Sequence, residues 1–330
     1  MSRLTSAARQ AVLDFGLGRQ ALAWRRSNPL ILMYHGVADR KAVPGTIRNL
    51  DSKHIPVDAF ARQLRVLKRW RKVLPLTDLV QGLIRGDDMR NTVALTFDDG
   101  YENNVTRAAP MLADFGMCGT FYLTTGYVGA ERWVWNDLLE FVLDQARVAE
   151  INVPALGRRL PLGSTERKLQ ALAQIKVSMK TRQEVEYLDE VRELARQAGV
   201  ECHSPQDDYR FMSWDQARGL LAGGFEVGAH TVNHPILSRV PIEVAQREIL
   251  QSRDAIVEQL GSCSKVFCYP NGKPQDYTRD IIEFCRQHFV AALATARGPA
   301  KATELFELRR LGPSGGVSED HIEWCLLRER

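Results

Sequence analysis

Short apolar runs alternate with amphipathic helical patterns along most of the chain. Apolar runs typical of buried strands cover residues 30–34, 92–97, 119–124, 224–229, 265–269 and 290–294, and residues 308–311 are a candidate final strand. Between the runs, apolar residues recur with helical spacing, as at Phe60, Leu64 and Leu67. Strands that alternate with helices indicate an α/β fold with a parallel sheet, either open or closed into a barrel.

The alternation is interrupted between about residues 131 and 212. Good helix formers dominate residues 135–146, 165–180 and 182–198, and no strand with a recognisable partner is found there. We therefore expect a helical insertion, either a lid over a site or, as the preferred interpretation, a structural buttress. The predicted organisation is an N-terminal segment over residues 1–28 and one α/β domain over residues 29–330 that contains this insertion.

The N-terminal segment follows a pattern of its own. Leu4, Ala8, Val12 and Phe15 have helical spacing, and arginines lie between them. A basic amphipathic helix can lie on an anionic membrane surface. The alternative is a helix packed on the outside of the fold, so peripheral membrane contact through residues 1–27 is one of two interpretations.

Composition excludes several classes of protein. Of 330 residues, 45% are hydrophobic and 25% charged, as in an ordinary soluble globular protein. A formal net charge of +4 predicts no nucleic-acid partner. The six cysteines form no C-x-x-C pair, and no apolar run is long enough to span a membrane. Scattered thiols and the lack of a secretory signal predict a cytoplasmic protein, membrane-peripheral if residues 1–27 bind a surface.

Polar side chains stand where the predicted strands end. His35, Asp98, Asp99, His230 and Asn271 each follow an apolar run. In a parallel α/β barrel the loops after the strands open onto one face, so these side chains are expected to converge on one rim. Each is a weak signal alone, because Asp-Asp-Gly is often only a turn and a histidine near a strand end is usually structural.

His230 and His234 are a more specific signal. Histidines four residues apart on one helical turn present both rings to one side, which suits a divalent metal. Asp99 adds an oxygen ligand, and three protein ligands leave positions open for water and substrate, as in catalytic metal sites. The alternative is that His234, which precedes Pro235, caps a turn; the acidic strand end favours the metal.

Three motifs resemble those of the polysaccharide deacetylases of carbohydrate esterase family 4. They are TFDDG at residues 96–100, HTVNH at 230–234 and FCYPNG at 267–272. The resemblance covers about residues 29–130 and 213–295. It implies a distorted (β/α)7 barrel and metal-dependent removal of N- or O-acetyl groups from a glycan. The run LMYHGV at residues 32–37 and the insertion resemble a branch found among capsule and exopolysaccharide biosynthesis proteins.

The resemblance also implies a role for each motif residue. Asp98 corresponds to the general base, and Asp99 binds zinc or a similar ion together with His230 and His234. The backbone N–H of Asn271 is implied as a donor to the oxyanion. This agrees with the chemistry, because a metal lowers the pKa of its water toward about 7. Two adjacent aspartates on an extended segment point to opposite sides and can take separate roles.

Two family features have no direct counterpart. The family often carries an arginine in its third motif that orients the base; this chain has Lys265, a point charge and not a planar fork. The family's late Leu-x-x-His, whose histidine protonates the leaving amine, is absent. His35 is the first candidate for this acid, against a structural role, and His288 is a further one. Arg309 and Arg310 are candidates to orient a carboxylate, against a surface salt bridge.

Three functions stay open at this point. The leading one is a metal-dependent carbohydrate deacetylase, a hydrolase of carbon–nitrogen bonds other than peptide bonds, whose partner is an N-acetylated glycan. Tyr101, Tyr269 and Pro270 beside the motifs are expected to contact that substrate. The second is an amidohydrolase for a non-sugar acyl amide, since fold does not fix substrate. The third is a glycan-binding protein without turnover, against which the retained ligands and Asp98 argue.

Overall fold

The structure is a computed structural model that describes residues 27–39, 46–49, 53–180 and 187–312. The amphipathic pattern predicted for residues 1–27 lies outside these residues except for its last position. Within the described part of the chain, no helix is both long and apolar enough to cross a membrane. The five cysteines found there are free thiols.

The apolar runs form parallel strands, as the sequence pattern predicts. In spatial order these are β1 (Leu30–Tyr34), β5 (Thr92–Phe97), β6 (Thr120–Leu123) and β9 (Glu226–Ala229), followed by the pair β10 (Val266–Cys268) and β11 (Ala291–Leu293). The Ser264 N–H donates to the Val227 carbonyl over 2.7 Å and joins the start of β10 to β9.

Residues 308–311 close the ring of strands. Leu311 forms a bridge with Leu32 of β1, and Leu308 forms one with Leu293 of β11. The expected final strand is therefore present as two single bridges and not as a continuous ladder. With this segment as the seventh member, the architecture is the distorted (β/α)7 barrel that the sequence predicts.

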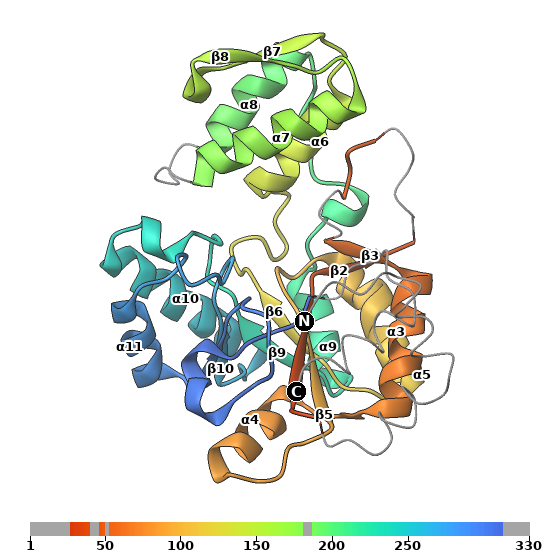
Figure 1. Ribbon diagram of the computed structural model, residues 1–330, viewed down its shortest axis with the longest axis vertical. Coiled ribbons are helices and arrows are strands. Elements are labelled where there is room, and N and C mark those ends of the chain that lie inside the picture. Colours follow the sequence, from red (N-terminus) through yellow and green to blue (C-terminus); the bar gives the residue numbers. More distant parts are fainter. Residues whose placement is uncertain (1–26, 40–45, 50–52, 181–186, 313–330) are drawn as a thin grey trace, which may run out of the picture.

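Helices cover the outside of the barrel (Figure 1). They are α3 (Val57–Trp70), α4 (Leu76–Arg85), α5 (Ala109–Phe115), α9 (Trp214–Ala222), α10 (Ile242–Leu260) and α11 (Arg279–His288). In α3 the predicted stripe of Phe60, Leu64 and Leu67 is the buried face. At the start of α9, the Ser213 hydroxyl accepts from the Gln216 N–H, and the Gln216 side chain accepts from the Ser213 N–H. These bonds satisfy two N–H groups that the start of a helix leaves unpaired.

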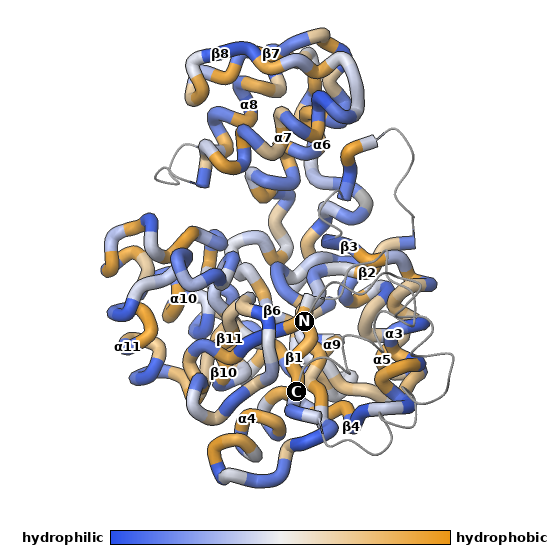
Figure 2. The backbone as a smooth tube through the Cα atoms, in the orientation of Figure 1, coloured by the Kyte–Doolittle hydropathy of each residue, from blue (hydrophilic) through white to orange (hydrophobic). Residues whose placement is uncertain are grey.

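Shorter elements complete the barrel layer. These are β2 (Gly36–Ala38), β3 (His54–Pro56), β4 (Lys72–Val73) and a π-helical turn at Asn104–Ala108 that precedes α5. The core lies inside the strand ring and between the strands and the helices. Every residue of β5 is buried, and its Phe97 stacks on Phe121 of β6 with ring centroids 4.7 Å apart. Figure 2 shows the hydrophobic residues concentrated in the strands and on one side of the outer helices.

The insertion forms a separate layer above the barrel, which we call the cap (residues 131–212). It contains α6 (Trp135–Gln145), α7 (Thr165–Lys180) and α8 (Tyr187–Ala198), and their buried apolar residues form a core distinct from that of the barrel. The chain leaves and re-enters the barrel at one point, where the Gly129 N–H donates to the Met212 carbonyl over 2.9 Å.

The expectation that the insertion holds no paired strand is wrong. Residues Glu150–Val153 and Arg158–Pro161 form the antiparallel hairpin β7–β8. In β7 exposed and buried positions alternate, which is the pattern of a half-buried strand. The apolar positions Ile151, Val153 and Leu160 pack into the core of the cap.

Candidate active site

Side chains from the carboxyl ends of four strands line one cavity of about 510 Å³. His35 follows β1, Asp98 and Asp99 follow β5, His230 follows β9, and Asn271 lies in the turn after β10. The structure thus brings together residues that are up to 236 positions apart in the sequence, on the rim where the barrel pattern predicts them.

Asp99, His230 and His234 point their ligand atoms at a common point. Asp99 Oδ1 lies 3.6 Å from His230 Nε2 and 3.5 Å from His234 Nε2, and the rings of the two histidines are 5.0 Å apart. Asp99 Oδ1 is buried and has no hydrogen-bond partner. A buried carboxylate oxygen left unpaired is costly, and a cation between these atoms satisfies it. The three residues therefore fit a divalent metal.

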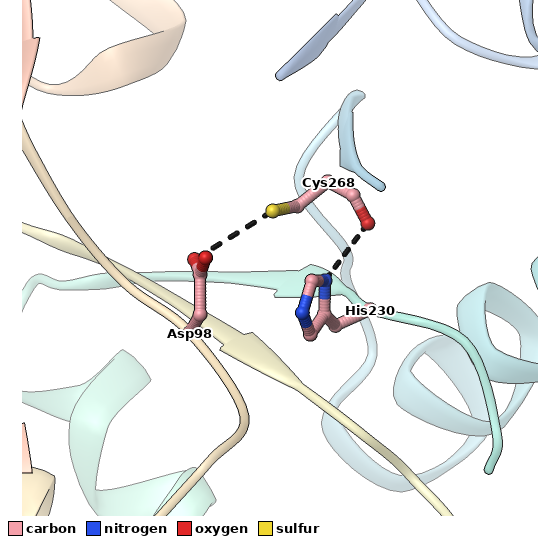
Figure 3. A group of neighbouring side chains, drawn as sticks. All are labelled: Asp98, His230 and Cys268. Carbon is pink, nitrogen blue, oxygen red and sulfur yellow. Dashed lines mark hydrogen bonds between the residues drawn. The ribbon is translucent and has the colours of Figure 1, made fainter. Parts of the chain in front are cut away.

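The hydrogen bond of His230 and the lowered pKa of His234 suit this role. The His230 Nδ1 lies 2.8 Å from the Cys268 carbonyl oxygen (Figure 3). Because a carbonyl only accepts, Nδ1 carries a proton, and this tautomer directs Nε2 toward Asp99, as in many metal-binding histidines. Burial lowers the pKa of His234 to about 4, although the nearby charge of Asp99 opposes this shift. His234 is therefore neutral near pH 7.

The loop that carries the two histidines is not the helical turn that their spacing predicts. Thr231 and His234 have φ values of 66° and 59°, in the left-handed region that helices of L-residues avoid. Glu248 of α10 holds the loop by accepting from the Val232 and Asn233 N–H groups over 2.9 and 2.8 Å. The rings converge because of this clamp and not because of helical periodicity.

Left-handed backbone is concentrated at the cavity. Besides Thr231 and His234, Asp99 and Asn271 have φ values of 75° and 57°. Each such non-glycine residue costs about 1–3 kcal/mol and persists where its surroundings over-determine it. Four strained residues around one cavity indicate that the rest of the fold holds these side chains in place.

Arg310 holds Asp98 from inside the barrel. Its Nη1 and Nη2 donate to Asp98 Oδ1 and Oδ2, both over 2.8 Å, in the two-pronged geometry of an arginine–carboxylate pair. Its Nε donates to the Ala294 carbonyl over 3.0 Å, and Arg310 is 1% exposed. Burial raises the pKa of Asp98, but the charge and hydrogen bonds of Arg310 outweigh burial and hold that pKa below its ordinary range.

Of the cationic residues singled out in the sequence, only Arg310 reaches a carboxylate of the cavity. Arg309 pairs with Glu304 over 2.8 Å on the half-exposed outside of the barrel, which is the surface salt bridge of the alternative interpretation. Lys265 is exposed and precedes β10, at the end of the strand opposite to Asn271. It is therefore too far along the strand to orient Asp98. His288 ends α11 and lines a separate pocket beside Lys265.

Cys268 lies between Asp98 and His230 (Figure 3). Its thiol donates to Asp98 Oδ1 over 3.6 Å, and its carbonyl oxygen accepts from His230. Asp98, His230 and Cys268 form a second group with the spacing of metal ligands. They fit a metal less well, because Asp98 is already paired with Arg310 and burial raises the pKa of the Cys268 thiol well above its ordinary value.

The cap forms one wall of the cavity. Val134, Trp135 and Asn136 line it from the start of α6, and Lys180 lines it from the end of α7. Lys180 Nζ donates to Asn271 Oδ1 over 3.0 Å and so bridges the cap and the barrel. The insertion is therefore more than an external buttress, since it borders the site directly.

A network of hydrogen bonds anchors this wall. No local signal in the sequence reveals it. Lys53, which lines the cavity, donates to Asp137 of α6 over 2.6 Å and to the Tyr101 hydroxyl over 2.9 Å. The Tyr101 hydroxyl donates to the other oxygen of Asp137 over 2.6 Å. Lys53 and Tyr101 belong to the barrel layer and Asp137 to the cap, so this network connects the cap to the barrel.

The three residues expected to contact substrate do not line the cavity. Tyr101 is fully buried in the network with Lys53, and Tyr269 stacks on Tyr277 at 4.2 Å within the apolar core. Pro270 is buried in the turn before Asn271. The expectation rested on proximity to the motifs in the sequence, which does not determine whether a side chain faces the cavity or the core.

Removing Asp137 should destabilise the protein by about 3 kcal/mol, because it leaves the partly buried Lys53 ammonium without its counter-charge. We expect this from urea unfolding of Asp137→Ala. Asp189→Ala is the matched control, since Asp189 pairs with Arg192 on the exposed face of α8 and such pairs contribute about 0–1 kcal/mol. Equal effects of both changes contradict the anchoring role.

His35 faces the cavity half-buried and forms no hydrogen bond with the described residues. Burial lowers its pKa, while the charges of Asp99 and Asp98 oppose that shift. The structural alternative for His35, a hydrogen bond to the backbone of a neighbouring loop, is not found in the described part of the chain.

Comparisons with known proteins agree with this site. The family model for polysaccharide deacetylase matches residues 85–290, more than half of the chain. A comparison of the sequence with curated proteins finds no match.

Solved deacetylases share the fold. The Streptococcus pyogenes deacetylase PplD in complex with acetate is 18% identical with a TM-score of 0.60, over 92% of this chain and 99% of its own. IcaB from Ammonifex degensii is 16% identical with a TM-score of 0.57, over 91% and 97%. A de-N-acetylase from Aggregatibacter actinomycetemcomitans is 15% identical with a TM-score of 0.53, over 90% and 99%. At these identities the likeness shows the fold alone.

The chain belongs to the polysaccharide deacetylase family. Its barrel, its metal-ligand group and its acidic strand end are those of a carbohydrate deacetylase, a hydrolase that acts on an acetylated glycan. Of the three functions left open by the sequence, the first is confirmed as far as a carbohydrate deacetylase that acts on an acetylated glycan.

Proposed function

We propose that the protein removes acetyl groups from the amide nitrogen of N-acetylated sugars in a polysaccharide or its precursor, with zinc as the metal. The observation that carries the proposal is the unpaired Asp99 Oδ1 beside two imidazole nitrogens, next to an aspartate that is not a ligand. A solved neighbour described as a de-N-acetylase supports the choice of an amide over an ester.

Asp99, His230 and His234 would hold the metal. One oxygen and two nitrogen ligands suit zinc, and the incomplete ligand set is typical of catalytic sites. When bound, a zinc ion there supplies a Lewis acid and makes a nucleophilic hydroxide available near neutral pH.

Asp98 would act as the general base. It accepts the proton of the attacking water, which its fixed position beside the ligand group allows. Arg310 occupies one lone pair on each carboxylate oxygen, and the Cys268 thiol donates to the second lone pair of Oδ1. A lone pair of Oδ2 is left for this proton. Arg310 is thus a positioning residue that keeps Asp98 ionised and oriented.

The turn after β10 would stabilise the developing negative charge. The Asn271 N–H is the donor that the family resemblance implies for the oxyanion. Asn271 has a left-handed backbone within a tight turn, in which the Pro270 carbonyl, on the same peptide as this N–H, accepts from the Gly272 N–H over 2.6 Å. The Thr295 hydroxyl holds the next peptide by donating to the Asn271 carbonyl over 2.9 Å. A preorganised donor of this kind costs no reorganisation during the reaction.

His35 would protonate the leaving nitrogen. An amine is expelled slowly from a tetrahedral intermediate unless its nitrogen is protonated. His35 lines the cavity with an imidazole that the described residues do not engage, and Asp98 and Asp99 are the nearest negative charges. Imidazole suits proton transfer near neutral pH.

If His35 is this acid, His35→Gln should bind metal normally and lose about 10²–10⁴-fold of its rate on an acetamide. The loss on an acetyl ester should be smaller, because an alkoxide leaves more readily than an unprotonated amine. Acetate release from an N-acetyl and an O-acetyl sugar measures both rates. Equal slowing of the two substrates indicates a structural role instead.

Acetate release from chitooligosaccharides tests the proposed function as a whole. We expect release by the zinc-loaded protein, loss of release after treatment with a chelator, and recovery when zinc is returned. Full activity of the chelated, metal-free protein contradicts the role of the metal. Release from O-acetylated but not N-acetylated sugars contradicts the choice of an amide substrate.

A further inference from the structure

The acidic side chains that line the cavity lie at the reaction centre, whereas lysines also line its outer part. The described lining contains no carboxylate besides Asp98 and Asp99. Asp98 is paired with Arg310, and Asp99 belongs to the metal-ligand group. The lining also contains Lys53, Lys180 and Lys273. The acidic groups of the cavity are therefore committed to the reaction centre, whereas the basic groups extend beyond it.

The lysines are not equivalent. Lys53 is the inner one and is neutralised by Asp137 over 2.6 Å. Lys180 and Lys273 lie at the rim, and each is associated with the turn at Asn271. Lys180 reaches Asn271 Oδ1 from the cap, and Lys273 is exposed two residues further along the turn.

The rim lysines belong to two different walls of the cavity. Lys180 ends α7 of the cap, and Lys273 lies on the barrel, where the Asp276 carboxylate fixes its backbone by accepting from the Lys273 N–H over 2.9 Å. Both lysines line the same cavity as Asn271, so a sugar whose acetyl carbonyl approaches the Asn271 N–H has both of them in the surrounding wall. Trp135 and Val134 form the apolar part of the same wall.

We propose that this site selects acetylated saccharides that carry a negative charge near the acetylated sugar, as a carboxylate or a phosphate. The inference rests on the proposed function and specifies its substrate class. A neutral sugar gives the rim lysines only neutral hydroxyl acceptors. An anionic group gives charge-assisted hydrogen bonds, which are about twice as strong as neutral ones.

Binding to the zinc-loaded protein tests the inference independently of turnover. The ligands are a tetrasaccharide of alternating N-acetylglucosamine and glucuronate, N-acetylglucosamine 1-phosphate and, as the neutral references, chitotetraose and N-acetylglucosamine. Calorimetry at low and at high salt should show at least about 10-fold tighter binding of each anionic ligand than of its reference at low salt, and a smaller difference at high salt. The two anionic ligands distinguish a carboxylate from a phosphate as the preferred group.

Single lysine changes locate the effect. Lys273→Met and Lys180→Met should each weaken binding of the preferred anionic ligand by about 3–10-fold and weaken binding of the neutral references clearly less. Lys265→Met is the matched control, because this exposed lysine lies at the opposite end of β10. Lys265→Met should leave the affinities for the anionic and the neutral ligands unchanged.

Equal affinities for neutral and anionic ligands overturn the inference, and so does an equal loss on both classes in the lysine variants. Acetate release from chitotetraose without any preference for the charged tetrasaccharide also overturns it, while the proposed function stands. A charge preference in binding without acetate release from any ligand supports the inference and contradicts the proposed function.

Discussion

The Asp98→Asn protein is expected to bind metal with unchanged stoichiometry and to lose about 10²–10⁴-fold of its deacetylase rate. The amide keeps the shape of the carboxylate but cannot take a proton from water. The three converging ligand atoms belong to Asp99, His230 and His234. Asp98 contributes none of them, so metal binding should be spared. Metal content by elemental analysis and acetate release measure the two effects separately.

Asp99→Asn and His234→Ala serve as the contrasting pair, because each removes one of the converging ligands. Both should lose metal and activity together while the fold, followed by circular dichroism, is kept, since the site lies on the rim of the barrel. Equal loss of metal in Asp98→Asn and Asp99→Asn shows that the roles of the two aspartates are misassigned.

Arg310→Met should destabilise the protein by about 3–5 kcal/mol, because it leaves the carboxylate of Asp98 buried without its counter-charge. The pair is almost completely enclosed, with side-chain exposures of 0% and 4%. Urea unfolding measures the effect. Arg309→Met is the control at the neighbouring position, where the pair with Glu304 is partly exposed and contributes about 0–1 kcal/mol.

Combining Arg310→Met with Asp98→Asn distinguishes the contribution of the charge pair to the free energy of unfolding from that of packing by the Arg310 side chain. With the carboxylate removed, the loss of Arg310 should cost clearly less than it does in the unchanged protein, since no ionised group is left buried. Additive effects of the two changes contradict the charge-pair explanation. An effect of Arg310→Met no larger than that of Arg309→Met contradicts it as well.

Local patterns were sufficient to predict most of the barrel. The strands at residues 30–34 and 92–97 were predicted with their bounds, because runs of consecutive buried apolar residues are typical of parallel strands. The rim residues followed from the strand ends. The hairpin β7–β8 was missed although Ile151 and Val153 alternate with exposed positions, since the surrounding helix formers dominated the interpretation of that stretch.

Contacts between distant segments could not be predicted from the sequence. Arg310 and Asp98 are 212 positions apart, and nothing near Arg310 distinguishes it from Arg309 until the closing segment is placed between β1 and β11. Lys53 and Asp137 are 84 positions apart in different layers of the fold. The spacing of His230 and His234 indicated the correct pair for a wrong reason, since a clamped loop and not a helix brings their rings together.

The narrow junction between Gly129 and Met212 has a consequence for how this enzyme can diversify. The strands on either side of the cap, β6 and β9, already pair with each other, so the whole cap is topologically one long loop. Its length and content can change without shifting the register of any barrel strand. Replacing residues 131–212 with the corresponding stretch of a homologous enzyme would therefore change one wall of the cavity, while the strands that precede Asp98, Asp99 and His230 keep their pairing.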